Sequence, residues 1–183
     1  TLQAPMILGY DAVGRVEAMG AEVVGFSVGD RVWCAGDANR PGSYAELQAV
    51  DFRIAAHAPD SVAPAAAAAM PLVTLTAWEV LFDRLQVPTD ASQKSLLVIG
   101  GAGGVGSVTL QLARKLTGLE AIATASRPES AAWCRKMGAH EVVDHRDLVA
   151  ESRRNGREFV DYIAQYNGLD IHWDAMCELI APQ

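Results

Sequence analysis

Three glycines that follow a short apolar segment have a spacing that suits the binding of a phosphate group. Leu96 to Ile99 form an uninterrupted apolar run, as expected for a parallel strand that is buried on both faces. Gly101, Gly103 and Gly106 then give the pattern G-x-G-x-x-G, and the apolar residues after them recur at helical spacing. In this pattern the first glycine allows a sharp turn, the second lets a pyrophosphate approach the backbone, and the third packs helix against strand. The helix N-terminus adds free N–H groups and a favourable dipole. The segment therefore predicts a dinucleotide site; the alternative is a tight turn without a ligand.

The end of the next expected strand indicates which dinucleotide would bind. Glu120 to Ala125 has the composition of a strand, and Ser126 and Arg127 follow it, about 20 residues after the glycines, where a ribose-contacting residue is expected. Neither residue is a carboxylate that could accept a hydrogen bond from the 2′-hydroxyl of NAD. Ser126 can donate a hydrogen bond, and the Arg127 guanidinium can pair with a 2′-phosphate. These residues predict NADP(H); an alternative is that Arg127 is a solvated loop residue and Glu129 contacts the ribose.

The length and composition favour a cytoplasmic α/β protein. The chain has 183 residues, of which 50% are hydrophobic, so it can form one sizeable core or two small ones. A net charge of −7 without a basic stripe argues against nucleic acid as the main partner, and the cluster Arg153, Arg154 and Arg157 is interpreted as a solvated helix end or loop. No apolar run has the length of a membrane span, and no signal-peptide pattern is present.

The cysteines indicate neither a disulfide framework nor a zinc site. Cys34, Cys134 and Cys177 are odd in number, far apart in the sequence and without a C-x-x-C pair. Reduced thiols of this kind are typical of a cytosolic protein. We expect each of them to be a small, buried or half-buried side chain.

The first half of the chain changes character near residue 58. Residues 1–58 contain short glycine-punctuated runs, such as Val13 to Ala18 and Arg31 to Ala35, and some strand alternation from Ser43 to Val50. They predict a small irregular barrel or sandwich. Residues 59–93 predict connecting helices, because Pro64 precedes the alanines Ala65 to Ala69 and a second helical pattern follows Pro71. The apolar face expected to pack in the core of that second helix consists of Leu75, Trp78, Phe82 and Leu85.

Residues 94–183 alternate between strand and helix patterns, which is typical of a parallel sheet covered by helices. The first two strands are those described above. Gly138 stands where it would end a helix in the left-handed conformation. The further elements expected are a helix from Ala131 to Met137, a strand from Glu141 to Asp144, a strand from Phe159 to Ala164, and a helix from His172 to Ile180.

Three separated segments together resemble one protein family. They are LGYDAVGRVEAMGAEVVGFSVGDRVW (Leu8 to Trp33), AAAMPLVTLTAWEVLFDRL (Ala67 to Leu85) and LLVIGGAGGVGSVTLQLARKL (Leu96 to Leu116), with VDYI and HWDAMCELIAPQ further on. In this order they resemble the medium-chain dehydrogenase/reductase superfamily and, within it, the quinone-oxidoreductase-like, zinc-type alcohol dehydrogenase-like group. The resemblance covers essentially the whole chain. It implies part of a GroES-like catalytic domain in residues 1–58, connecting helices in 59–93, and part of a doubly wound Rossmann NADP(H)-binding domain in 94–183.

The resemblance also implies roles for particular residues. Thr76 would lie near the nicotinamide, although a helical threonine can simply bond to the preceding turn. Ser126 and Arg127 would face the 2′-phosphate. His145 occupies the place where related reductases carry an aromatic residue beside the adenosine, and an ordinary surface role is the alternative. The loop that would hold the pyrophosphate consists of Gly101, Ala102, Gly103, Gly104, Val105 and Gly106.

The chain departs from the family pattern where catalytic zinc would bind. Zinc-dependent relatives carry a Gly-His-Glu segment, whereas this chain has Gly9, Tyr10 and Asp11, and tyrosine cannot replace the imidazole ligand. The four closely spaced cysteines of a structural zinc site are also missing. We therefore expect no metal and a hydride transfer from NADPH to a quinone, an enone or a similar activated carbonyl acceptor. Tyr10 is either a hydrogen-bond donor near the substrate or a buried packing residue, and the catalytic residues are not identified.

The resemblance finally implies that both domains are truncated and that this chain is a portion of an enzyme, inactive by itself. A sheet with the order 3-2-1-4 would have its fourth strand, near Val160, as an exposed edge. Relatives often dimerise through a part of the sheet beyond this edge, so a homo-oligomer is one expectation. The alternatives are a non-catalytic NADP(H)-binding module and, more remotely, a zinc-dependent alcohol dehydrogenase.

Overall fold

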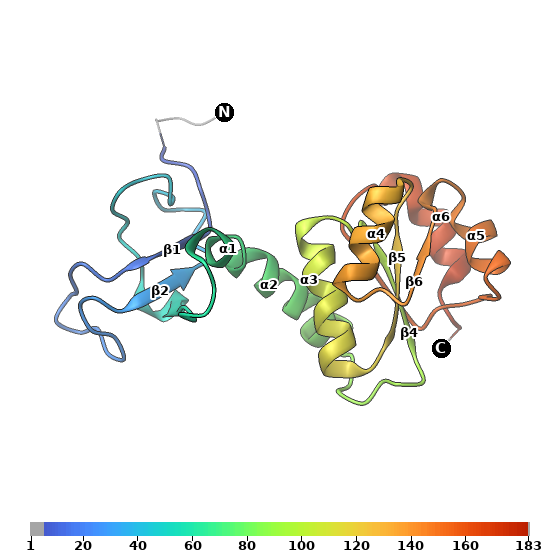
Figure 1. Ribbon diagram of the computed structural model, residues 1–183, viewed down its shortest axis with the longest axis horizontal. Helices are drawn as coiled ribbons and strands as arrows, with labels where there is room; N and C mark the ends of the chain where they lie inside the picture. The colour runs from blue at the N-terminus through green and yellow to red at the C-terminus, as the bar shows by residue number, and fades with distance from the viewer. Residues whose placement is uncertain (1–5, 183) are drawn as a thin grey trace. The chain divides into compact units, whose positions relative to one another are not determined.

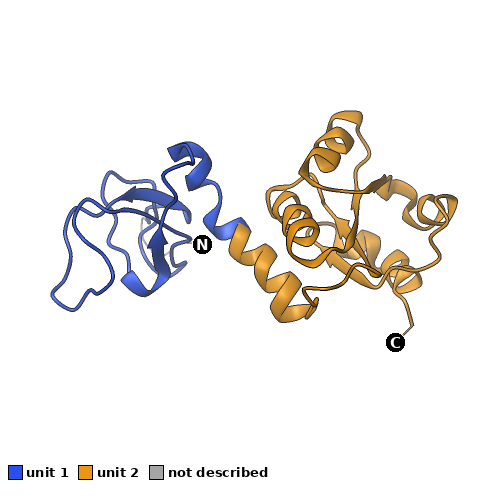
Figure 2. Cartoon of the chain, turned by 60° about the horizontal axis from the view of Figure 1, so that its bottom comes forward, with its two compact units in different colours: residues 1–73 blue, residues 74–183 orange. Residues whose placement is uncertain are grey.

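The computed structural model describes residues 6–182, and the chain forms two compact units, residues 1–73 and 74–183 (Figure 2). The first unit contains a three-stranded antiparallel sheet in the order β1-β2-β3. In its register Val13 pairs with Trp33, and Trp33 pairs with Ala56. The elements of this unit are β1 (Ala12–Arg15), β2 (Arg31–Cys34), a 3-10 turn (Phe52–Ile54), β3 (Ala55–His57), α1 (Pro64–Ala68) and the start of α2 (Pro71–Trp78).

The segment from Ser43 to Val50 is not a strand, so that prediction was wrong. Its first residues bond to the chain near the N-terminus instead: the Tyr44 N–H donates to the Leu8 carbonyl at 2.9 Å. The apolar side chains that suggested alternation are not buried in this unit, since Tyr44 is 78% and Leu47 is 75% exposed. Alternation without a surface to pack against does not produce a strand.

The second unit is a four-stranded parallel sheet in the order β6-β5-β4-β7 (Figure 1). Numbered along this sheet the order is 3-2-1-4, which confirms the prediction. Two π-helical segments, Glu79–Arg84 and Ala113–Thr117, continue α2 and α3, and a 3-10 turn, His145–Asp147, precedes α5. The strands are β4 (Ser95–Ile99), β5 (Glu120–Thr124), β6 (Glu141–Val143) and β7 (Tyr162–Gln165), and the helices are α3 (Gly104–Leu112), α4 (Pro128–Met137), α5 (Leu148–Arg154) and α6 (Leu169–Leu179).

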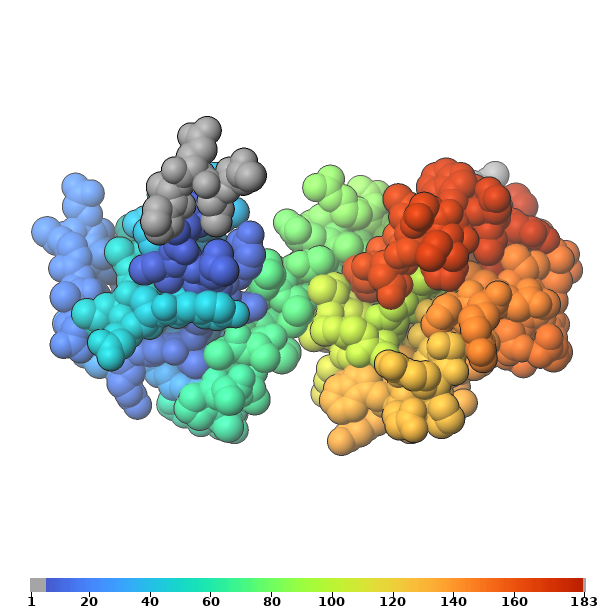
Figure 3. Space-filling view, turned by 90° about the horizontal axis from the view of Figure 1, so that it is seen from above, coloured from blue at the N-terminus to red at the C-terminus, as the bar shows by residue number. Residues whose placement is uncertain are grey.

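Both faces of the sheet are covered by helices, as expected for a doubly wound fold. Leu96 and Val98 of β4 belong to one core cluster, together with residues of α3 and α4. Leu97 and Ile99 point to the other face and pack with Leu179 of α6 and its neighbours. The continuous apolar run therefore alternates between two cores, because successive strand residues face opposite sides. Helices α5 and α6 pack against each other on the second face. The orange and red atoms of this part of the chain lie side by side in Figure 3.

Two further sequence predictions concern a helix end and a helix face. Gly138 ends α4 with φ +116°, in the left-handed region, as expected. The predicted core face of the helix after Pro71 is wrong in part, because Leu75 is 56% and Trp78 is 47% exposed. The buried side of this helical stretch is instead formed by Ala77 and Leu81. Leu81 lies where the helix meets the sheet of the second unit, so tertiary contact and not periodicity selects the face.

Strand β7 is at the edge of the sheet, and the chain passes beside it again near residue 180. The Val160 N–H donates to the Leu179 carbonyl at 2.8 Å, and the Ala181 N–H donates to the Val160 carbonyl at 2.9 Å. These bonds form an isolated parallel bridge between Val160 and Ile180. The predicted strand from Phe159 to Ala164 is thus shorter at its start, where pairing is limited to this bridge.

Arg157 connects the start of β5 to the start of β6 through two ion pairs. Its guanidinium bonds the Glu120 carboxylate and, at 2.7 Å from Nε to Oε2, the Glu141 carboxylate. The Arg157 side chain is only 19% exposed. Interpreting the whole basic cluster as a solvated helix end or loop was therefore wrong for this residue, although Arg153 and Arg154 are exposed.

We predict that Arg157→Met lowers the free energy of unfolding by about 1–2 kcal/mol, between the values for exposed and buried pairs. The Arg157 hydrogen bond lowers the pKa of Glu120 below its usual 4.5. A lowered carboxyl pKa stabilises the fold above the unfolded-state pKa, and this contribution is lost as the pH falls through the folded-state pKa. Denaturant unfolding at pH 7 and at pH 3 should therefore show a smaller mutational effect at pH 3.

The matched control is Arg154→Met, because Arg154 pairs with Glu151 on the exposed surface of α5. It should change the unfolding free energy by less than about 0.5 kcal/mol at either pH. Equal effects of the two variants would show that the connection between β5 and β6 does not stabilise the sheet.

Candidate functional site

The turn between β4 and α3 begins at Gly100, one residue before the predicted motif. Gly100 has φ +84°, in the left-handed region that favours glycine. Its N–H donates to Thr124 Oγ1 at 3.2 Å, and its carbonyl accepts from the Gly103 N–H at 3.0 Å. The turn therefore begins at Gly100 and has Gly101 as one of its central residues, as predicted, but the left-handed conformation is that of Gly100, one residue before the motif.

Close packing leaves no room for a side chain at Gly101 or at Gly106. A Cβ on Gly101 would lie 2.8 Å from Ala123 Cβ on β5 and 3.3 Å from Cys134 Sγ on α4. A Cβ on Gly106 would lie 2.3 Å from the Gly100 carbonyl oxygen and 2.7 Å from Gly101 Cα. Gly106 thus packs the helix against the strand end, as the sequence pattern predicted.

The N-terminus of α3 is open to solvent. Gly103 is the N-cap residue and makes no side-chain hydrogen bond to the helix, and Gly103 and Gly104 are exposed. The first helical N–H groups, those of Gly104, Val105 and Gly106, have no carbonyl acceptor among the described residues. Unpaired N–H groups at an exposed helix N-terminus, without side chains to obstruct them, fit a pyrophosphate.

Side chains from other elements hold α3 in place. The Trp133 indole N–H donates to Ser107 Oγ at 2.8 Å. Thr109 Oγ1 bonds the Val105 carbonyl at 2.9 Å and the Tyr166 hydroxyl at 2.6 Å. Burial raises the pKa of Tyr166, so its hydroxyl keeps its proton at neutral pH. The sequence did not indicate these partners, because they are far apart along the chain.

Ser126 and Arg127 lie at the carboxyl ends of the strands, as this loop does. They follow β5, which runs parallel to β4 with Val98 opposite Ala123. Ser126 is half-buried, whereas Arg127 is exposed, and its Nη2 lies 3.4 Å from Ser130 Oγ. Glu129 is exposed in the first turn of α4. The Arg127 guanidinium therefore has room for an anion, and its pairing with a 2′-phosphate stays a prediction.

His145 follows β6, the next strand of the sheet. It is half-buried, and its ring centroid lies 5.9 Å from that of the buried His172 on α6, in an edge-on arrangement. Beside it, hydrogen bonds from Arg146 lower the pKa of Asp144 to about 2. Thr76 comes from a helix, α2, and not from a strand end, and it is half-buried. The cofactor contacts of both residues stay predictions.

The residues at the expected zinc position do not have the arrangement of metal ligands. The Asp11 carboxylate accepts a hydrogen bond from the Leu72 N–H in the first turn of α2, at 2.6 Å. Tyr10 is 51% exposed, so interpreting it as a buried packing residue was wrong. Cys34 is buried, and desolvation raises the pKa of its thiol. Among residues 6–182, no three His, Cys, Asp or Glu side chains come close enough together to hold a metal ion.

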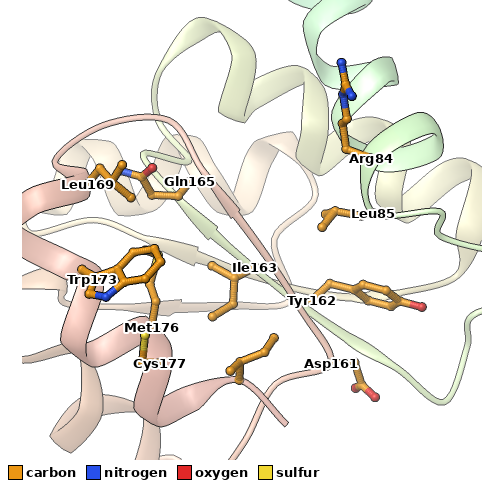
Figure 4. Close-up of a pocket in the computed structure, with 11 residues that line it drawn as sticks. Arg84, Leu85, Asp161, Tyr162, Ile163, Gln165, Leu169, Trp173, Met176 and Cys177 are labelled. Atoms are coloured by element: carbon orange, nitrogen blue, oxygen red, sulfur yellow. The ribbon is translucent and has the colours of Figure 1, made fainter. Parts of the chain in front are cut away.

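A groove of about 440 Å³ runs beside the edge strand β7 and does not include the glycine loop (Figure 4). Ile163 of β7 and Trp173 and Met176 of α6 line it, together with Asp161 at its polar end. Cys177 also lines it and is exposed, so the prediction that every thiol is buried or half-buried was wrong for this residue. An edge strand presents unpaired backbone N–H and C=O groups along its outer side.

Two family models match complementary parts of the chain. The alcohol dehydrogenase GroES-like domain matches residues 1–60, and the zinc-binding dehydrogenase model matches residues 104–183. The chain belongs to the medium-chain dehydrogenase/reductase superfamily. Its small antiparallel sheet is the GroES-like part, and its parallel sheet is the Rossmann-like part. Within the superfamily it is zinc-type alcohol dehydrogenase-like and quinone-oxidoreductase-like.

Individual members of the superfamily show how much of the family this chain spans. It is 45% identical over 98% of its length to a zinc-type alcohol dehydrogenase-like protein of Staphylococcus aureus, of which it covers 55%. It superposes with a TM-score of 0.91 on a candidate zinc-dependent alcohol dehydrogenase of Rhizobium etli, at 44% identity, covering 97% of this chain and 53% of that one.

A third member was solved with its cofactor. The Escherichia coli quinone oxidoreductase complexed with NADPH matches with a TM-score of 0.80 and 29% identity, covering 95% of this chain and 52% of that one. The chain therefore spans about half the length of the superfamily members it matches. None of the helices within residues 6–182 combines the length and the apolar character that crossing a membrane requires.

Proposed function

We propose that the chain forms the cofactor-binding part of an NADPH-dependent oxidoreductase that reduces a quinone, an enone or a similar activated carbonyl without zinc. The observation that carries this proposal is the open N-terminus of α3, with its unpaired N–H groups and the exposed residues Gly103 and Gly104. It lies at the carboxyl ends of the strands, where Arg127 follows β5. The likeness to a quinone oxidoreductase complexed with NADPH supports it.

The residues of this chain would bind and orient the cofactor. The N–H groups of Gly104 to Gly106 would hold the pyrophosphate, and Ser126 and Arg127 would select the 2′-phosphate. His145 would pack against the adenine, while Thr76 would lie near the nicotinamide. NADPH, when bound, supplies the hydride. The protein then contributes mainly alignment, because a quinone or an enone stabilises the developing negative charge itself.

The residues in place of the metal ligands support the zinc-independent part of this proposal. Tyr10 supplies no imidazole nitrogen, and the Asp11 carboxylate is occupied by the Leu72 N–H. We predict that prolonged dialysis of the protein that carries this chain against a zinc chelator changes its rate of NADPH oxidation with a quinone by less than about twofold, since no Lewis acid is needed for such an acceptor. Metal analysis of the same samples is the companion measurement. One tightly held zinc per chain, removed together with the activity, would revive the alcohol dehydrogenase alternative.

The proposal is tested by measuring NADPH binding and then NADPH oxidation with a panel of quinones and enones, in the protein that carries this chain. Binding with turnover supports the reductase. Binding without turnover of any acceptor would favour a non-catalytic NADP(H)-binding module, and absence of binding would overturn both.

A further inference from the structure

Asn167 lies beside the glycine turn, although no sequence motif includes it. Strand β7 runs parallel to β4 with Gln165 opposite Ile99, and the Tyr166 N–H donates to the Ile99 carbonyl at 3.1 Å. The two strands therefore end together, and the residues that follow them are neighbours. A Cβ on Gly100 would lie 3.0 Å from Asn167 Oδ1 and 3.5 Å from Asn167 Nδ2. The Asn167 amide thus rests against the backbone of the turn.

The backbone on both sides of Asn167 is held in place. Thr109 has one hydroxyl proton, which it donates to the Val105 carbonyl, so the Tyr166 hydroxyl donates to Thr109 Oγ1 at 2.6 Å. This bond ties the residue before Asn167 to the first turns of α3. On the other side Gly168, with φ +65°, is the N-cap of α6. Gln165 Nε2 donates to the Asn167 carbonyl. The two bonds of Tyr166, to Ile99 and to Thr109, therefore hold Asn167 beside the glycine turn.

Within the described part of the chain, the side-chain amide of Asn167 is not engaged in hydrogen bonds, whereas its backbone is. It is exposed, and its amide makes no hydrogen bond to another residue between 6 and 182. An amide carries two N–H donors and no charge, so it can bond a phosphate oxygen without the repulsion that a carboxylate would cause. A free donor held beside a turn with unpaired N–H groups adds to their capacity to bind an anion.

The sheet order places this donor where a ligand is expected. From β4 the chain proceeds through β5 to β6 on one side, and then crosses back to place β7 on the other side. The carboxyl ends of β4 and β7 therefore flank the point at which the strand order reverses. In open parallel sheets, ligands bind in the crevice outside the carboxyl ends of the strands at this point. Asn167 and Gly100 form its two sides.

We propose that Asn167 Nδ2 donates a hydrogen bond to the pyrophosphate of the dinucleotide held at the glycine turn, which makes Asn167 a cofactor-binding residue. The inference rests on the proposed binding of NADP(H). Because the pyrophosphate is common to NADPH and NADH, Asn167 contributes equally to both affinities. Arg127, which faces the 2′-phosphate, contributes only to the affinity for NADPH. Replacing Asn167 should therefore weaken the binding of both dinucleotides, whereas replacing Arg127 should weaken the binding of NADPH alone.

The experiment measures the dissociation constants of NADPH, NADH and 2′-AMP for the wild-type chain and for Asn167→Ala by titration calorimetry. The variant should bind NADPH and NADH each about tenfold more weakly, as for the loss of one hydrogen bond to a charged group. Its affinity for 2′-AMP, which has no pyrophosphate, should be unchanged. Asn167→Asp, which has the same shape and a negative charge, should weaken both dinucleotides more than Asn167→Ala does, and most strongly at low salt.

Thermal unfolding of each variant controls for loss of structure, and Asn39→Ala, in an exposed loop of the first unit, is the matched surface control. Unchanged dinucleotide affinity in Asn167→Ala would overturn the inference while leaving the proposed function in place. A loss confined to NADPH would also overturn it, because the contact would then be to the 2′-phosphate. If the wild-type chain binds neither dinucleotide, the proposed function fails, and the inference fails with it.

Discussion

A Gly106→Ala variant is expected to lose measurable NADPH binding and to unfold at lower denaturant concentration than the wild-type chain. The added Cβ would lie 2.3 Å from the Gly100 carbonyl oxygen and 2.7 Å from Gly101 Cα. Both are backbone atoms, so the helix must move away from the strand end. Overpacking of this kind costs about 1–3 kcal/mol. Denaturant unfolding would measure this loss, and fluorescence titration with NADPH would measure binding.

Two other glycines separate the effect on folding from the effect on binding. A Cβ on Gly103 would meet only the Gly100 carbonyl oxygen, at 3.3 Å, so Gly103→Ala should fold normally and still obstruct the pyrophosphate. A Cβ on Gly20 would meet nothing within 4 Å, so Gly20→Ala should change neither property. Normal NADPH affinity in Gly103→Ala would show that the pyrophosphate does not bind at this turn.

An Arg127→Ala variant is expected to bind NADPH and NADH with similar affinity, whereas the wild-type chain should bind NADPH at least about tenfold more tightly. One charge-assisted hydrogen bond contributes about 1.5–3 kcal/mol, which corresponds to this factor or more. NADH lacks the 2′-phosphate, so its affinity should not change. Because Arg127 is exposed, the preference of the wild-type chain should also decrease as salt is added. Dissociation constants at two salt concentrations would check both statements.

Two variants on the same helix serve as controls for Arg127→Ala. Arg135→Ala removes an exposed arginine near the opposite end of α4 and should leave the cofactor preference unchanged. Glu129→Ala tests the alternative in which this carboxylate contacts the ribose. A loss of NADH affinity in Glu129→Ala, with no change in Arg127→Ala, would show that the site is built for NAD.

Local patterns in the sequence were sufficient for the elements that carry the proposed site. The strand of β4, the glycine turn and α3 are contiguous, so their order and their hydrophobic periodicity could be read together. The left-handed Gly138 and the strand order 3-2-1-4 were also predicted correctly, the latter with the help of the family resemblance. These features depend on residues within one strand–helix unit or on a topology that such units share.

Local patterns were insufficient wherever the partner of a side chain lies elsewhere in the chain. The alternation from Ser43 to Val50 and the apolar residues Leu75 and Trp78 have the composition of buried segments, yet they are largely exposed in their own units. Burial requires a second surface, and a short pattern does not report whether one is present. The left-handed conformation of Gly100 was not predicted for a related reason, since Gly100 lies against β5 and Asn167, which are distant in the sequence.

The sequence by itself thus determined the type of site this protein carries: a strand, a glycine-rich turn and a helix N-terminus, followed one strand later by an arginine in place of a carboxylate. Only the tertiary structure decided which distant residues meet there. Tyr166 contacts Thr109 and Asn167 contacts Gly100 because β7 lies beside β4 in one register. That register is set by the packing of two cores on opposite faces of the sheet, which no local segment specifies.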